Sequence, residues 1–200
     1  MINHHYLRSR VWVILAFCLS MALPLKASEL VIDESSFRCL NTMTPVRGFF
    51  VDNLMGDLQS TLEVAHSATG GVYPPGSVVQ LVPGEVMVKH PQGVSPATKD
   101  WEFFELKATP LGSQIMKRGF VDVNNQFGGN CFACHIKARP EWDLICEQDH
   151  GCDPLEITPK VISLIQQTDP RCEEQPTLSP EDQKILADFV AALSASQSAE

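Results

Sequence analysis

Residues 131–135 read Cys-Phe-Ala-Cys-His, and this motif constrains the chain more than any other feature of its sequence. Two cysteines separated by two residues and followed at once by a histidine form the attachment signature of a c-type haem. The chemistry requires this spacing, because two thiols add across the two haem vinyl groups while the adjacent histidine reaches the iron. The motif therefore predicts one covalently bound haem c, held by Cys131 and Cys134, with His135 as an axial ligand of the iron.

Three other interpretations of the motif compete with haem attachment. A thioredoxin-like redox pair would follow a strand in a βαβ unit, whereas this motif follows Gly128-Gly129-Asn130 and no such pattern precedes it. A chance match is the second alternative, because only three of the five positions are fixed. A zinc site is the third, although its last spacing is not that of a zinc knuckle; its ligands would come from Cys131, Cys134, Cys146, Cys152 and His150. Haem is favoured because the motif agrees with the signs of export at the N-terminus.

The N-terminus has the pattern of a secretory signal peptide. The first ten residues include Arg8 and Arg10 and no acid, the next fifteen are almost wholly apolar, and Ala27 precedes a polar stretch. This pattern predicts a signal peptide over 1–27, with an uncleaved anchor helix as the alternative. The mature chain is then periplasmic and has no contact with the membrane. Arg8, Arg10 and Lys26 leave with the signal, so the formal net charge falls from −9 to −12.

The rest of the chain is predicted to form a single domain. The composition, 44% hydrophobic and 20% charged residues, is typical of a globular protein and excludes wholesale disorder. No later apolar run approaches the roughly 20 residues of a membrane span. Nucleic acid is excluded as a partner, because phosphate binding needs clustered Lys and Arg and this chain is acidic. We expect one mono-haem domain over 28–195 and a disordered tail over 196–200.

Six cysteines follow the predicted signal peptide, and two of them belong to the motif. In an oxidising compartment the other four form at most two disulfides, in one of three pairings. We expect Cys146–Cys152, which closes a short loop, and Cys39–Cys172, which joins the two ends of the domain. The second disulfide closes a long loop, and by constraining the unfolded chain it would stabilise the fold by about 3–5 kcal/mol.

Hydrophobic periodicity and turn residues predict an α+β fold, a mainly antiparallel β-sheet with an N-terminal and a C-terminal helix. Pro83-Gly84 predicts the turn of a β-hairpin, and Ser179 predicts the N-cap of the last helix. The expected elements are a helix at 51–65, strands at 77–82, 85–90, 100–108 and 114–123, and helices at 158–168 and 180–195, after an irregular segment at 28–45.

The residue opposite His135 decides what the iron can do. An electron-transfer cytochrome fills this sixth position with Met or His, which raises the potential and keeps other ligands off. The 65 residues after His135 contain no Met, and their only His, His150, lies inside a predicted disulfide loop. The upstream candidates are Met43, Met55, Met87, Met116, His66 and His90. We therefore expect an open distal position, with Phe103, Phe104 and Phe132 either walling the haem or forming ordinary core.

Three stretches between residues 73 and 143 resemble the cytochrome P-460 family and its relatives, the beta-type cytochromes c-prime. Tyr73-Pro-Pro-Gly-Ser-Val-Val is similar to the family's aromatic-x-x-Gly-Thr-Val turn and strand. Met87-Val-Lys-His with the later Trp101 is similar to its V-K-D strand and tryptophan. The stretch from Cys131 to Asp143 resembles the haem motif and the acidic position that follows it. The resemblance implies an exported mono-haem protein, mainly antiparallel β-sheet, with the motif late in the chain.

One position departs from the family pattern. P-460 proteins cross-link a lysine on the first hairpin strand to the haem, and its counterpart here, counted from Gly76-Ser77-Val78, is Leu81. A different alignment places Lys89 at the cross-link. However, Lys89 already fits the family's second lysine, and without that resemblance it would read as an exposed strand lysine. We therefore expect no cross-link, and the resemblance then implies binding of nitric oxide, as in the c-prime branch, more than hydroxylamine oxidation.

Three functions compete at this point. The first is an open haem site that binds or redox-converts small nitrogen species, nitric oxide or hydroxylamine, with or without enzymatic turnover. The second is a periplasmic electron carrier with six-coordinate iron, whose acidic surface would steer it to a basic redox partner protein. The third is a haem-free binding module stabilised by disulfides. The missing downstream Met argues against the second and the motif argues against the third. The c-prime relatives also imply a homodimer.

Overall fold

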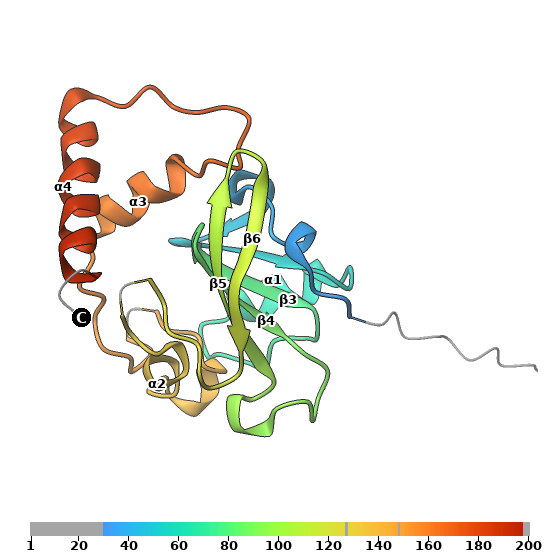
Figure 1. Cartoon of the computed structure of the whole chain (residues 1–200). Coiled ribbons are helices and arrows are strands. Elements are labelled where there is room, and N and C mark those ends of the chain that lie inside the picture. The colour runs from blue at the N-terminus through green and yellow to red at the C-terminus, as the bar shows by residue number, and fades with distance from the viewer. Residues whose placement is uncertain (1–29, 127, 148, 198–200) are drawn as a thin grey trace, which may run out of the picture.

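The computed structural model describes residues 30–126, 128–147 and 149–197; the predicted signal peptide over 1–27 lies outside them. In this part of the chain, six strands form one antiparallel sheet in their sequence order (Figure 1). The strands are β1 (Thr44–Val46), β2 (Phe49–Asn53), β3 (Ser77–Val82), β4 (Glu85–Lys89), β5 (Trp101–Thr109) and β6 (Gly112–Gly119). The α-helices are α1 (Leu58–Ala65), α2 (Cys131–His135), α3 (Pro159–Gln167) and α4 (Pro180–Gln197). The predicted α+β class and antiparallel sheet are confirmed.

The four predicted strands correspond to β3, β4, β5 and β6, and the predicted turn at Pro83-Gly84 joins the first two. The last strand ends earlier than predicted, at Gly119. The segment at 28–45 is not wholly irregular, because it contains two short 3-10 turns and leads into β1. Strand β1 is only three residues long, too short to leave an alternating pattern in the sequence.

The predicted helix over 51–65 is wrong in its first part, where β2 and a turn take its place. Burial in β2 alternates with the two-residue period of a strand, with Phe49 and Val51 buried. The apolar spacing that resembled one helix is therefore shared between a strand and a shorter helix. Helix α1 begins only after Asp57, whose side chain accepts a hydrogen bond from the Ser60 N–H and caps the helix.

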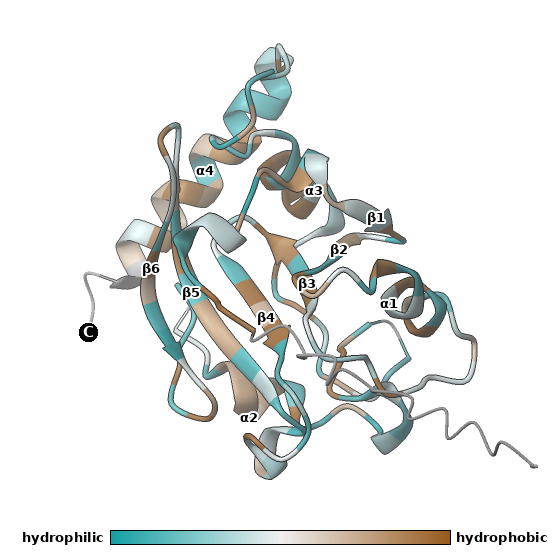
Figure 2. Ribbon diagram, turned by 90° about the vertical axis from the view of Figure 1, so that its right-hand side faces the viewer, coloured by the Kyte–Doolittle hydropathy of each residue, from teal (hydrophilic) through white to brown (hydrophobic). Residues whose placement is uncertain are grey.

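The sheet buries both of its faces, as the apolar residues along its central strands indicate (Figure 2). One face is formed by Val79, Met87, Trp101 and Phe103. We call it the motif face, because Cys131 and Phe132 pack against it. The opposite face is formed by Val78, Val86, Val88, Phe104 and Leu106, and the N-terminal segment from Ile32 to Met43 covers it.

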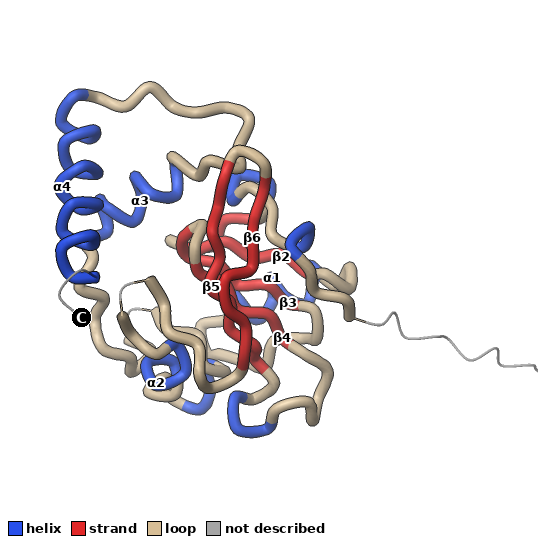
Figure 3. The backbone as a smooth tube through the Cα atoms, viewed as in Figure 1, coloured by secondary structure: helices blue, strands red, loops and turns tan. Residues whose placement is uncertain are grey.

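Helices α2, α3 and α4 lie on the same side of β5 and β6 (Figures 1 and 3). Thr158 and Ser179 cap α3 and α4 with their side-chain oxygens, the second as predicted. Helix α4 continues to Gln197, two residues into the segment 196–200, and the disordered tail expected there stays a prediction. Residues 198–200 lie outside the described part. None of the described helices has the length and apolar character needed to cross a membrane.

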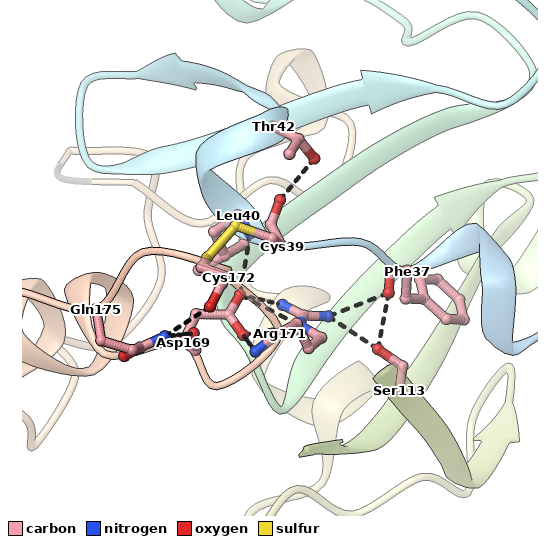
Figure 4. Close-up of a disulfide and its surroundings, with 9 residues drawn as sticks. All are labelled: Phe37, Cys39, Leu40, Thr42, Ser113, Asp169, Arg171, Cys172 and Gln175. Atoms are coloured by element: carbon pink, nitrogen blue, oxygen red, sulfur yellow. Dashed lines mark hydrogen bonds and ion pairs between the residues drawn. A yellow bond between two sulfur atoms is a disulfide. The ribbon is translucent and has the colours of Figure 1, made fainter. Parts of the chain in front are cut away.

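Both predicted disulfides are present. Cys146–Cys152 joins two cysteines that are six positions apart, shortly after the motif. Cys39–Cys172 joins residues 133 positions apart and ties the N-terminal segment to the loop after α3 (Figure 4). Among the described residues, the four cysteines outside the motif are therefore all paired.

A buried ion pair supports the long-range disulfide (Figure 4). Arg171 Nη2 lies 2.7 Å from Asp169 Oδ2, and both side chains have almost no exposed surface. The Asp169 carboxylate also accepts a hydrogen bond from the Leu40 N–H. Arg171 Nη1 lies 3.0 Å from the Ser113 hydroxyl, which itself donates to the Phe37 carbonyl. These bonds connect the N-terminal segment, β6 and the loop after α3 on the side of the sheet away from the motif face.

Candidate functional site

The motif forms α2, a short helix whose start is tied to the segment that leaves β6. Asn130 caps it by accepting a hydrogen bond from the Ala133 N–H at 2.8 Å. The Cys131 N–H donates to the Val123 carbonyl at 2.9 Å, and Asn130 Nδ2 donates to the Val121 carbonyl at 3.0 Å. The two cysteines and the histidine are therefore presented from one turn in a fixed direction.

Cys131 and Cys134 are half-buried and belong to neither disulfide. Burial raises the pKa of Cys131 to about 12, and the nearby Glu85 carboxylate adds to this effect. A redox-active cysteine needs the opposite, a lowered pKa that yields a thiolate. The Cys146–Cys152 disulfide also takes two ligands from the zinc site considered above. The raised pKa of Cys131 weighs against a redox pair, and the disulfide weighs against the zinc site.

One hydrogen bond orients the ring of His135. Its Nδ1 lies 2.7 Å from the Leu144 carbonyl oxygen, which can only accept, so Nδ1 carries the proton and donates. Nε2 is then the nitrogen with a free lone pair, as in histidines that bind a metal. Burial lowers the pKa of His135, so the ring is neutral near pH 7. The ring packs against Phe103 of β5, with 5.3 Å between the ring centroids.

Apolar side chains surround the motif. The Phe132 and Phe103 rings are 6.5 Å apart between centroids. Further partly buried side chains pack against the core cluster to which Phe103 belongs: Leu58, Leu62, Val64 and Leu81. Phe104 points to the opposite face, where its ring lies 5.0 Å from that of Phe37. Of the three phenylalanines considered as haem walls, Phe132 therefore belongs to the motif, Phe103 lies beside it, and Phe104 lies on the other face of the sheet.

The four methionines considered as a sixth ligand are spread over the molecule. Met43 belongs to the core of the opposite face, and Met116 is 56% exposed on β6. Met55 lies in the turn before α1. Met87 is on the motif face and pairs across the strands with Phe103, so it belongs to the packing around the motif histidine.

The histidines considered for the same role have other contacts. His66 is exposed at the end of α1. His90 Nε2 lies 2.7 Å from a carboxylate oxygen of Glu102. His150 is buried and stacked on Trp142, with 3.7 Å between the ring centroids, and its Nδ1 donates to a backbone carbonyl. Hydrogen bonds therefore engage His90 and His150 with partners outside the motif.

Two carboxylates lie near the motif, and the sequence analysis missed both. Glu85 of β4 is directly across from Glu105 of β5, and its Oε1 is buried without a hydrogen-bond partner. Burial, together with the charge of Glu105, raises the pKa of Glu85 to about 7. The available signal was the two-residue spacing of Glu85, Met87 and Lys89, which places all three on one face of the strand.

Lys89 forms a buried ion pair with Asp143. The residues are 4% and 2% exposed, and Lys89 Nζ lies 2.8 and 3.0 Å from the two carboxylate oxygens. Nζ also lies 2.6 Å from the Lys99 carbonyl, so all three ammonium protons have an acceptor. The interpretation of Lys89 as an exposed strand lysine is wrong, because a carboxylate 54 residues away compensates its charge inside the protein.

The residues that carry the family resemblance meet at this ion pair. The Tyr73 N–H donates to the Asp143 carboxylate at 2.9 Å, and Trp101 Nε1 donates to the Asp143 carbonyl at 2.7 Å. The centroids of the Tyr73 and Trp101 rings are 5.5 Å apart, and Lys89 Nζ lies 5.0 Å from the centroid of the Trp101 ring. Three stretches that are separate in the sequence therefore form one network next to the motif.

Comparison with known proteins gives no identification. No family model matches the chain, and no match is found among curated proteins or solved structures. The resemblance to the cytochrome P-460 family therefore rests on the quoted residues, and the function has to be inferred from the arrangement of the site.

Proposed function

We propose that this chain is an exported c-type mono-haem protein whose iron keeps an open distal position and binds, or redox-converts, small nitrogen species such as nitric oxide. The observation that carries the proposal is the His135 ring, whose Nδ1–H is bonded to the Leu144 carbonyl so that Nε2 is left for a metal. Cys131 and Cys134, on the same turn, have no disulfide partner and fit the attachment of one haem c. When bound, the haem supplies an iron that can take up a small ligand.

The side chains around the motif fit this role. Phe103 and Phe132 provide apolar surface beside the histidine. Such apolar surface would keep water away from the histidine side of a bound haem. Met43 lies in the core of the opposite face, Met116 is exposed on β6, and hydrogen bonds engage His90 and His150, which favours an open sixth position over six-coordinate iron.

The contacts of Lys89 support the expectation that no lysine is cross-linked to the haem. A lysine that forms a covalent bond needs a free amine lone pair, whereas the Lys89 ammonium donates to three oxygens. Leu81, at the other candidate position, has no nucleophilic atom. Binding of nitric oxide, which the resemblance implies for the c-prime branch, is therefore favoured over oxidation of hydroxylamine.

The disulfides support export. Two disulfides are typical of an oxidising compartment, and together with the predicted signal peptide they favour the periplasm. In this compartment the acidic surface would meet a redox partner protein with a basic face.

Attachment is tested by producing the full chain in cells that have the c-haem maturation machinery. We expect covalent haem by mass spectrometry of the unreduced protein, and loss of the haem in Cys131→Ala/Cys134→Ala. The matched control is Cys146→Ala/Cys152→Ala, which removes two cysteines from the neighbouring loop and should keep the haem. A colourless wild-type protein would overturn the proposal in favour of the haem-free binding module.

The ligand is tested on the same preparation by adding nitric oxide to the reduced protein. We expect a saturable change in the optical spectrum with one ligand bound per haem. A holoprotein whose spectrum does not respond would contradict the open distal position and favour the electron carrier.

A further inference from the structure

We infer that the buried Lys89–Asp143 ion pair is a positioning device for His135, because it fixes the carbonyl group that holds the imidazole ring. The inference rests on the proposed haem site and adds the residues that set the orientation of its axial ligand. Lys89 and Asp143 would touch neither the iron nor its ligand and would act through the Leu144 carbonyl.

The chain between the motif and this carbonyl makes an unusual turn. Asp143 has a φ of 50° and Leu144 a φ of 68°, so two consecutive residues with side chains are in the left-handed region. This conformation is costly for such residues and persists only where the surroundings hold it in place. The turn therefore depends on its contacts.

The contacts of Asp143 supply that support. Its carboxylate accepts two hydrogen bonds from Lys89 Nζ and one from the Tyr73 N–H, while its carbonyl accepts one from Trp101 Nε1. Lys89 and Trp101 belong to neighbouring strands of the sheet, where they are paired directly across from each other. The turn is therefore anchored to the sheet through both the side chain and the main chain of Asp143.

The next residue carries the connection to the iron ligand. The Leu144 side chain is buried in the core of the motif face, and its carbonyl oxygen lies 2.7 Å from His135 Nδ1. A change in the backbone at Asp143 would displace this acceptor, because only one peptide unit separates the two residues. A histidine that loses this bond becomes a weaker electron donor to a metal, and its ring is free to rotate.

An ion pair serves this purpose better than an apolar pair of the same volume. Apolar side chains fill space without a required direction, and they often stabilise a fold as well as a buried ion pair does. Here each carboxylate oxygen has a donor at a fixed place, so the carboxylate has one orientation and the backbone next to it follows.

The test is a comparison of holoprotein variants by two measurements that report on the axial histidine. We expect Asp143→Asn and Lys89→Met to lower the iron–histidine stretching frequency in the resonance Raman spectrum of the reduced protein. We also expect Asp143→Asn to raise the reduction potential; Lys89→Met removes a positive charge, which acts on the potential in the opposite direction, so the frequency is the readout for that variant. Lys89→Arg keeps the charge and should recover part of the frequency.

The matched control is Asp169→Asn, which breaks a second buried ion pair, one that contacts Phe37 and Leu40 of the N-terminal segment. It should destabilise the fold without moving either the frequency or the potential. Equal shifts in Asp143→Asn and Asp169→Asn would mean that the effect is general loosening, and would overturn the inference.

A second variant covers the case in which the single substitutions fail to fold. Lys89→Met/Asp143→Leu leaves no unpaired buried charge, and we expect it to fold, keep its haem and show the lowered frequency. A folded double variant with the wild-type frequency and potential would overturn the inference. These readouts require a wild-type protein that carries haem, so failure of the attachment test would instead refute the proposed function itself.

Discussion

Removing the Cys39–Cys172 disulfide, by changing both cysteines to alanine, should cost the protein much more stability than removing Cys146–Cys152. A disulfide acts mainly on the unfolded chain, whose conformational entropy it reduces in proportion to the logarithm of the loop length. The two loops differ strongly in length, because the bonded cysteines are 133 positions apart in one disulfide and 6 positions apart in the other. The same relation gives a loss of about 5 kcal/mol for the long loop and about 2 kcal/mol for the short one.

The assay is urea unfolding of the holoprotein and both double-alanine variants, followed by far-ultraviolet circular dichroism. We expect the free energy of unfolding to fall in the order wild type, short-loop variant, long-loop variant. The hydrogen bonds around Asp169 and Arg171 do not need the sulfur atoms, so the long-loop variant should keep its native spectrum before it unfolds (Figure 4). A larger loss for the short loop would refute the chain-entropy argument.

Two further substitutions test single contacts, with the free energy of unfolding as the measurement for both. Because burial raises the Glu85 pKa from 4.5 to about 7, the wild type should lose stability as the pH rises between these values. Glu85→Gln should remove that loss and gain up to about 3 kcal/mol above pH 7; equal pH profiles would contradict this. Gly70→Ala should lower the free energy of unfolding by about 3 kcal/mol or more. The φ of Gly70 is +80°, and an added Cβ would lie 2.1 Å from the Glu141 carbonyl oxygen. A loss below about 1 kcal/mol would show that the loop moves to make room, and would contradict this prediction.

Local signals in the sequence predicted much of the fold. Pro83-Gly84 predicts the hairpin between β3 and β4 because the conformation of a tight turn depends mainly on the residues in it. Ser179 predicts the start of the last helix because an N-cap bonds to a backbone N–H only three residues away. The disulfide pairing followed from loop lengths once the motif cysteines were set aside. The helix predicted over 51–65 failed because its apolar residues fit two periods, and only pairing with β1 and β3 selects the strand.

The site was predictable only where it is local in sequence. Cys131, Cys134 and His135 follow from one motif, but the acceptor for His135 Nδ1 lies nine residues later, in a turn whose conformation the sequence does not reveal. The burial of Lys89 depends on Asp143, 54 residues away, so its charge made an exposed position the simpler prediction. The facing carboxylates of Glu85 and Glu105 depend in the same way on the register between two strands.

The central claim, one covalent haem with an open iron, is tested most directly by an optical spectrum of the mature protein from cells competent in c-haem maturation. It is recorded oxidised, reduced, and reduced under carbon monoxide. We predict broad, unsplit reduced bands that shift when carbon monoxide is added, since no protein ligand would occupy the sixth position. Sharp, split reduced bands that do not respond to carbon monoxide would contradict the claim and identify an electron carrier.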